Sequence, residues 1–151
     1  MQDKNSPTYF VEQVKTALRE GTIPDQVFLI QGTKGNRIAY LRKIQYFLEN
    51  PTGALKGFGQ KHATEQLVGD IQSIVAITAG TMQKQSTKKE WSQVAVTLVN
   101  LQPMQRSTMV YIAKRDEEHN IIGWDEEYIP PYDTNEPLLD AFLNGYHSKA
   151  H

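Results

Sequence analysis

The spacing of apolar residues changes along the chain, from a helical period near the N-terminus to strand-like stretches later on. Ser6-Pro7 is typical of a helix start, with serine as the cap and proline in the first turn. From Phe10 to Leu18, apolar residues recur every three or four positions, and Gly21 is suited to end the helix. The pattern therefore predicts a first helix between Ser6 and Gly21.

Two further helices are predicted after a short buried strand at Val27-Phe-Leu-Ile30. Helical spacing is present over 36–50 and again over 61–79, with a glycine-rich connection over 51–60. The positions that carry this spacing are Ile38, Leu41, Ile44 and Leu48 in the first segment, and Leu67, Ile71, Ile74, Val75 and Thr78 in the second.

Beyond a polar stretch over 81–90, which we expect to form a loop, β-branched residues become frequent and predict strands. Gln102-Pro103 interrupts them, and 115–120 has the polar composition of a hairpin tip. The predicted strands cover 91–101, 107–114 and 121–124. A short last helix is expected around 138–143, closed by Gly145.

This order of elements indicates the α+β class, with about three N-terminal helices packed on an antiparallel sheet and a short C-terminal helix. The 151 residues, 39% of them hydrophobic, suit a single domain over 1–151 with one core.

Composition removes several classes of chemistry. The chain contains no cysteine, which excludes disulfides, thiol nucleophiles and cysteine-bound zinc. No apolar run is long enough to span a membrane, and Met1–Pro7 has no signal-peptide pattern. We therefore expect a cytoplasmic protein, although a domain taken from a larger exported chain would have the same composition.

The net charge of −1 hides an uneven distribution. Residues 1–89 hold 12 Lys and Arg against 7 Asp and Glu, whereas residues 90–151 hold 4 against 10. The segment from Lys34 to Lys61 could therefore hold an anion or polyanion. The simpler interpretation is that helix surfaces are charged and the imbalance has no functional meaning.

His62 is the main candidate for chemistry, within the stretch GFGQKHATEQL over 57–67. At the start of a helix and beside Lys61, its imidazole should be neutral near pH 7 and able to accept a proton from a ribose 2′-hydroxyl. Backbone N–H groups there could hold a phosphate, and Gly57 and Gly59 would allow a close approach. The alternative is an ordinary surface histidine at a helix start.

The GFGQKH stretch, followed by a helix and an antiparallel sheet, resembles the barnase–EndoU–colicin–RelE group of small metal-independent nucleases, including phage and toxin versions. The resemblance covers about 56–114. It implies that His62 acts on RNA as a general base, with Arg106 and Thr108 as the basic and hydroxyl groups on a strand. Arg106 and Thr108 share a face of that strand, whereas Tyr111 faces the other way. The acidic C-terminal part departs from the positive field that an RNA-cutting enzyme would use.

Phosphate or RNA binding is predicted for a set of basic residues and one glycine: Lys61, Arg37, Arg42, Lys43 and Gly59. The loop over 32–37 lacks the phosphate-loop pattern and is interpreted as a turn. The acidic clusters at 116–119 and 125–127 fit solvated charge better than a metal site. We expect no metal, no cofactor and no sequence-specific DNA binding.

Two functions of different class follow. The first is a metal-independent endoribonuclease of phage or toxin type that cleaves RNA by general acid–base catalysis. The second is a non-enzymatic interaction protein, of phage, defence or immunity type, that binds a protein or nucleic-acid partner through its charged surfaces. A protein partner would be an inhibitor, an immunity protein or a host target, bound by the acidic stretch from Asp116 to Asp140.

Overall fold

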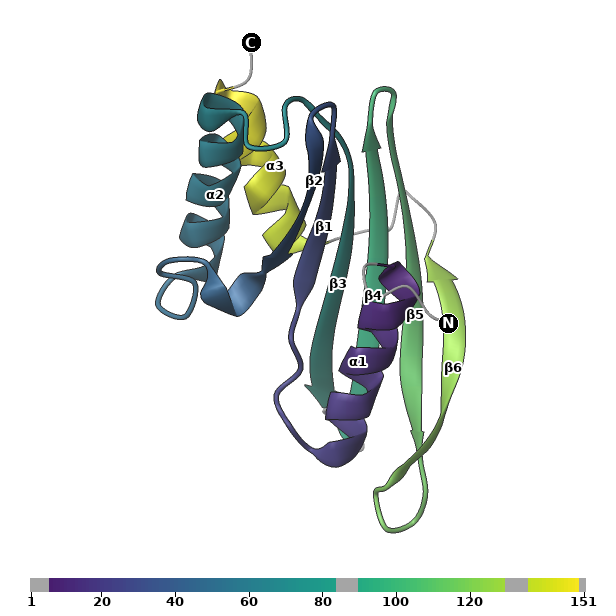
Figure 1. Cartoon of the computed structure of the whole chain (residues 1–151). Coiled ribbons are helices and arrows are strands. Elements are labelled where there is room, and N and C mark those ends of the chain that lie inside the picture. Colours follow the sequence, from purple (N-terminus) through teal and green to yellow (C-terminus); the bar gives the residue numbers. More distant parts are fainter. Residues whose placement is uncertain (1–5, 84–89, 130–135, 150–151) are drawn as a thin grey trace.

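Six antiparallel strands form one sheet, with helices on both of its faces (Figure 1). The computed structural model describes residues 6–83, 90–129 and 136–149. The elements in chain order are α1 (Pro7–Glu20), β1 (Val27–Gly32), β2 (Gly35–Tyr40), the 3₁₀ turn η1 (Leu41–Lys43), α2 (Pro51–Glu65), β3 (Ile71–Gln83), β4 (Glu90–Leu101), β5 (Met104–Arg115), β6 (Ile121–Ile129) and α3 (Pro137–Lys149). The strand order is β2-β1-β3-β4-β5-β6, so β2 and β6 are the edges.

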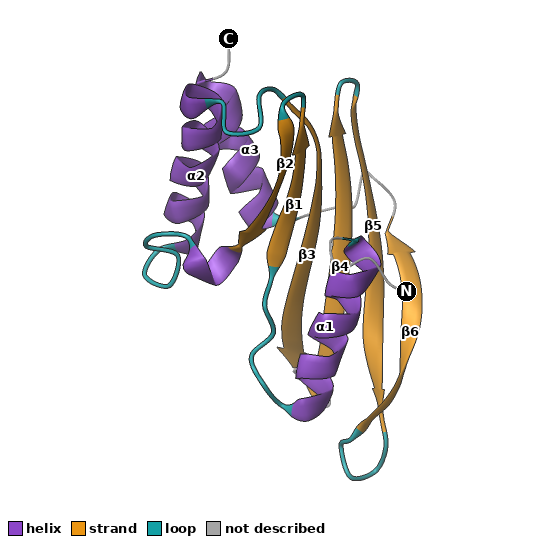
Figure 2. Ribbon diagram, in the orientation of Figure 1, coloured by secondary structure: helices purple, strands orange, loops and turns teal. Residues whose placement is uncertain are grey.

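The sheet lies between two helical layers, with α1 on one face and the α2–α3 pair on the other (Figure 2). Adjacent residues of β1 pack against different helical layers. Val27 belongs to the apolar cluster of α1, and Phe28 belongs to that of α2 and α3. Strand β3 alternates in the same way, with Ile74 and Val75 on opposite faces. The central strands are therefore buried on both sides.

Helix α1 confirms the predicted first helix and its two ends. The Ser6 hydroxyl oxygen accepts a hydrogen bond from the Tyr9 amide at 3.3 Å. At the other end, Gly21 adopts a left-handed conformation with φ of 73°. Both features are those expected of a capped helix.

The helix predicted over 36–50 is wrong. Residues 35–40 form β2, which pairs with β1 so that Ile38 lies opposite Leu29. Gly32 and Gly35 bound the two-residue turn of this hairpin, and Gly35 has a φ of 145° that suits only glycine. Pairing with β1 fixes residues 35–40 as a strand, and of the apolar positions in the predicted helix Leu41 is buried beyond the strand whereas Leu48 is exposed, so their helical spacing does not correspond to one buried face.

The helix predicted over 61–79 is also wrong, because β3 begins at Ile71. Its apolar residues follow one another almost without interruption, as they do in a strand covered on both faces. Such a run also contains residues three and four positions apart, so it satisfies the helical pattern by chance. Only α1 therefore precedes the sheet, where about three helices were expected.

The glycine-rich segment over 51–60 is the first part of α2 rather than a connection. Asn50 caps the helix by accepting a hydrogen bond from the Gly53 amide at 3.2 Å, and Pro51 occupies the first turn. Two glycines allow α2 to approach α3 closely. A Cβ atom on Gly59 would overlap the Phe142 carbonyl oxygen, and one on Gly145 would overlap the carbonyl oxygen of Lys56.

The predicted strands of the later part are confirmed as β4, β5 and β6, each longer than expected. Gln102-Pro103 forms the turn between β4 and β5, where Leu101 pairs with Met104. The last helix begins as predicted but continues through Gly145 to Lys149. Of the loop predicted over 81–90, β3 takes the first residues, and 84–89 lie outside the described residues. None of the described helices has the length and apolar character needed to cross a membrane.

Two neighbouring glycines of α2 provide a matched test of this helix packing. Gly59→Ala should lower the free energy of unfolding by about 1–3 kcal/mol, because the new methyl group pushes α3 away. Gly57→Ala meets no atom within 4 Å and should raise it by about 0.5–1 kcal/mol through improved helix propensity. Urea unfolding of both variants measures the difference. Equal effects would show that α2 and α3 do not depend on close contact.

Candidate functional site

A groove of about 580 Å³ lies between the edge strand β2, the turn after η1, and α2. Arg37, Lys43 and Lys61 contribute its three cationic side chains, and none of its lining residues is acidic. Tyr40, Tyr46 and Phe58 contribute aromatic rings. We call this surface the basic groove. Three of the residues predicted to bind phosphate therefore meet in one concave surface.

Two of the cations are held over aromatic rings. The Arg37 guanidinium lies 5.2 Å from the centre of the Phe58 ring, and the Lys43 ammonium lies 5.1 Å from that of Tyr40. Cation–π contacts of this kind orient a charge without neutralising it. Within the described part of the chain, neither these two cations nor Lys61 form an ion pair. Their positive charge is therefore available to an anion.

Tyr46 has an unusual backbone conformation beside the cations. It is the third residue of a turn closed by a 3.1 Å hydrogen bond from the Phe47 amide to the Ile44 carbonyl oxygen, and its φ is 68°. This position favours glycine or asparagine, and a bulky residue with positive φ is a rare outlier. The Tyr46 side chain is 66% exposed, so packing does not explain its presence. Strained residues of this kind occur preferentially at functional sites.

His62 lies in the core at the end of α2, not at a helix start as the sequence suggested. Its side chain is 0% exposed. The imidazole packs edge-on against Phe58, at 4.5 Å between ring centres, and against Phe142 of α3, at 5.4 Å. The helix that was expected to begin near His62 instead ends at Glu65. The positive helix end invoked for this residue is therefore absent.

The hydrogen bonding of His62 defines its protonation. Nδ1 lies 2.9 Å from the Phe58 carbonyl oxygen, which can only accept, so Nδ1 carries the proton. Nε2 is left with its lone pair, buried and without a hydrogen-bond partner among the described residues. Burial lowers the pKa of His62, the hydrogen bond to Phe58 partly opposes it, and the charges of Arg37 and Lys61 lower the pKa further. The neutral imidazole predicted from the sequence therefore has burial as its main cause.

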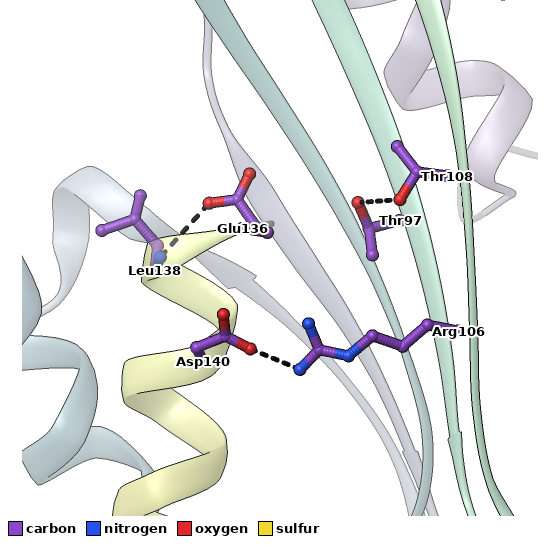
Figure 3. A network of polar contacts seen from close by, with 6 residues as sticks. All are labelled: Thr97, Arg106, Thr108, Glu136, Leu138 and Asp140. Carbon is purple, nitrogen blue, oxygen red and sulfur yellow. Dashed lines mark hydrogen bonds and ion pairs between the residues drawn. The ribbon is translucent and has the colours of Figure 1, made fainter. Parts of the chain in front are cut away.

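Arg106 and Thr108 share one face of β5, as predicted, and both have partners there (Figure 3). Arg106 forms an ion pair with Asp140 of α3. The Thr108 hydroxyl lies 3.1 Å from that of Thr97 on β4. These contacts tie the sheet to α3 and join neighbouring strands.

Helix α3 separates this pair from His62. Asp140, which contacts Arg106, and Phe142, which contacts His62, are two positions apart on α3 and so point in nearly opposite directions. The three residues predicted to form a catalytic centre therefore do not line a common cleft.

The remaining predicted phosphate ligands, Arg42 and Gly59, lie outside the basic groove. Arg42 forms an ion pair with Asp25 at 3.0 Å between Nη2 and Oδ1. Gly59 faces α3, so its lack of a side chain serves helix packing. Sequence reasoning missed Tyr46 and Phe58. In the helix predicted over 36–50, Tyr46 was not one of the apolar positions, so the sequence indicated only an exposed aromatic residue there.

The acidic residues of the β5–β6 hairpin make contacts within the fold. Within the described ranges, no three His, Asp or Glu side chains gather closely enough to hold a metal ion. Asp116 instead organises the tip, where its Oδ1 accepts hydrogen bonds at 2.9 Å from the Glu118 and Asn120 amides. Asp125 pairs with Lys114 at 3.1 Å.

The fold and the groove together define an α+β protein with a cationic, aromatic depression at one edge of its sheet. Comparison of the chain with protein-family models, curated proteins and solved structures gives no match.

Burial of neutral His62 predicts a pH-dependent stability. Because the pKa is lower in the folded protein than the ordinary 6.5, the unfolded chain binds the proton first as the pH falls. Stability should therefore decrease below pH 6.5 by up to about 1.4 kcal/mol per pH unit, until the folded-state pKa is reached. His62→Phe should flatten this dependence, whereas His147→Gln at an exposed site should retain it. Urea unfolding between pH 8 and 5 measures it, and equal slopes for wild type and His62→Phe would contradict the burial.

The left-handed conformation of Tyr46 predicts a stabilising substitution. Glycine adopts this backbone without a steric penalty, and the exposed ring contributes little packing. Tyr46→Gly should therefore raise the free energy of unfolding by about 1 kcal/mol. The same change at Tyr128, an exposed residue within β6, should lower it, because glycine weakens a strand. Thermal or urea unfolding compares the two. Destabilisation at both sites would mean that Tyr46 is not strained.

Proposed function

We propose that the protein binds RNA through the basic groove without cleaving it. The observation that carries the proposal is the convergence of Arg37, Lys43 and Lys61 on one concave surface that also holds aromatic rings. Surfaces that follow a nucleic-acid backbone combine these two kinds of side chain. The proposal corresponds to the non-enzymatic hypothesis, with RNA as the partner.

Electrostatics support RNA as the partner. Each cation placed near a phosphate releases condensed counterions, which favours binding at low salt. Arg37 and Lys43 are already held over rings, so binding would restrict their motion less than that of unrestrained side chains. The groove thus has fixed positive charge at an edge of the protein where a polyanion could pass.

The acidic part of the chain offers less support for a basic protein partner. Asp140, Asp125 and Asp116 already have structural contacts, with Arg106, with Lys114 and with the amides of the hairpin tip. Charged side chains on an edge strand such as β6 also prevent unwanted pairing with other chains. Structural roles therefore account for these three aspartates of the acidic surface.

Burial argues against catalysis by His62. A general base must lie within hydrogen-bond reach of the proton it removes. The only nitrogen of His62 with a lone pair is Nε2, which is buried beside Phe58 and Phe142. A ribose hydroxyl could reach it only if α2 and α3 separated. We therefore expect binding without strand cleavage.

The electrostatic test measures binding of a fluorescent 12-nucleotide single-stranded RNA by anisotropy. With three cations engaged, the slope of log affinity against log salt should be about −2. Lys61→Glu and Lys43→Glu should each weaken binding by about tenfold at low salt and flatten the slope. Arg19→Glu makes the same change of charge in α1, outside the groove, and should have little effect.

Two results would contradict the proposal. Salt-insensitive binding, or equal losses in Arg19→Glu and Lys61→Glu, would remove the groove as the RNA site. The same RNA analysed on a denaturing gel should stay intact. Cleavage that His62→Ala abolished while the protein stayed folded would instead favour the ribonuclease hypothesis.

A further inference from the structure

We infer that the basic groove selects unpaired nucleotides and that Tyr46 is the surface on which a base stacks. The inference rests on the proposed RNA binding, and it specifies that the bound RNA is single-stranded. It assigns to the groove a specificity that charge alone does not give, because single strands and duplexes both carry phosphates.

The aromatic residues of the groove differ in whether their rings already contact other side chains of the protein. Phe58 packs against His62 and lies beneath Arg37, and Tyr40 packs against Phe10 and lies beneath Lys43. The ring of Tyr46 makes neither an aromatic nor a cation contact with the described residues, and its side chain is 66% exposed. Tyr46 is therefore the aromatic side chain of the groove that has a face open to a ligand.

The backbone of Tyr46 is fixed on both sides although its ring is exposed. The turn that contains Tyr46 is closed by the Phe47 amide, and the side chain of Phe47 is buried in the core. The Tyr46 carbonyl oxygen accepts a 2.9 Å hydrogen bond from the amide of Asn50, whose side chain caps α2. The position of the ring is thus tied to the helix that carries Lys61. A platform fixed before binding loses less entropy when a base stacks on it.

The arrangement suits a strand whose bases are exposed. An aromatic ring can stack on any base, whatever its sequence, while neighbouring cations contact the phosphates. In a duplex the bases are stacked on one another inside the helix, and one of them could reach Tyr46 only after unpairing. Because Tyr46 and the cations line the same depression, a single strand can use both at once, whereas a duplex can use only the cations.

The first arm of the test compares ring variants on single-stranded and duplex RNA of the same length and sequence. Wild type should bind the single strand about tenfold or more tightly than the duplex. Tyr46→Phe, which keeps the ring, should retain this preference. Tyr46→Gly should lose about tenfold or more in affinity for the single strand and bind both forms alike. Tyr128→Ala removes another exposed tyrosine, 55% exposed on β6 and outside the groove, and should bind like wild type.

Tyr46→Gly is the informative variant because glycine suits the left-handed backbone, so a loss of binding cannot be attributed to unfolding. Its salt slope should equal that of wild type, since the three cations are unchanged. A 12-nucleotide backbone without bases should bind wild type as weakly as normal RNA binds Tyr46→Gly. Removing the bases should then have no further effect on that variant, which identifies base and ring as one interaction.

The outcomes distinguish this inference from the proposed function. If Tyr46→Gly binds both RNA forms like wild type while Lys61→Glu still weakens binding, the groove binds RNA but the stacking role is wrong. A preference for the duplex would overturn the inference in the same way. If wild type binds neither form, the proposed function fails, and the inference fails with it.

Discussion

The close contact between α2 and α3 is the constraint on which the groove depends. Gly59 and Gly145 place the backbone of each helix against the other, with no room for a Cβ atom at either position. His62 and Phe142 fill the space beside this contact. Because α2 is held in this way, Phe58 is positioned beneath the guanidinium of Arg37 on the edge strand. One side of the helix thus serves packing, and another forms a wall of the groove.

Around α2, the buried side chain is neutral and the charged side chains lie at the surface. Burial lowers the pKa of His62, and the nearby charges of Arg37 and Lys61 add to this effect, so the imidazole packed against Phe58 stays neutral. A protonated histidine would add a buried charge without a partner, which is costly in an apolar setting. Keeping the ring neutral leaves the positive charge at the surface, on side chains that an anion can reach.

Sequence patterns identified α1 and the strands of the later part because their signals agree with their surroundings. The Ser6 cap and Gly21 mark a helix that has one apolar face, and β4 and β5 are rich in β-branched residues. The pattern failed at β3, whose two buried faces give a continuous apolar run with no diagnostic period. It failed again at 51–60, where glycine usually indicates a loop but here permits close helix contact.

The site was predictable only in part, because its composition depends on tertiary contacts that the sequence does not show. The sequence placed the basic residues in one region, but it could not show that Arg42 pairs with Asp25 while Lys43, its neighbour, lies over Tyr40 in the groove. Which cations converge depends on how β2 and η1 direct their side chains. His62 looked catalytic because a buried and an exposed histidine are identical in sequence, and only the packing of α3 distinguishes them.

Tyr46 is the position where local preference and the observed structure disagree most. A left-handed turn residue with an exposed side chain would be glycine or asparagine if stability alone decided it. A tyrosine there carries a steric penalty and exposes apolar ring surface. Contacts of its ring with the rest of the described protein compensate for neither cost. Both costs become intelligible if the ring acts on a ligand, because a turn tied to the start of α2 holds it beside Lys43 and Lys61 in the same depression. The strained aromatic residue therefore indicates a functional groove as much as the charges do, since surface lysines alone are common and a strained, exposed tyrosine is not.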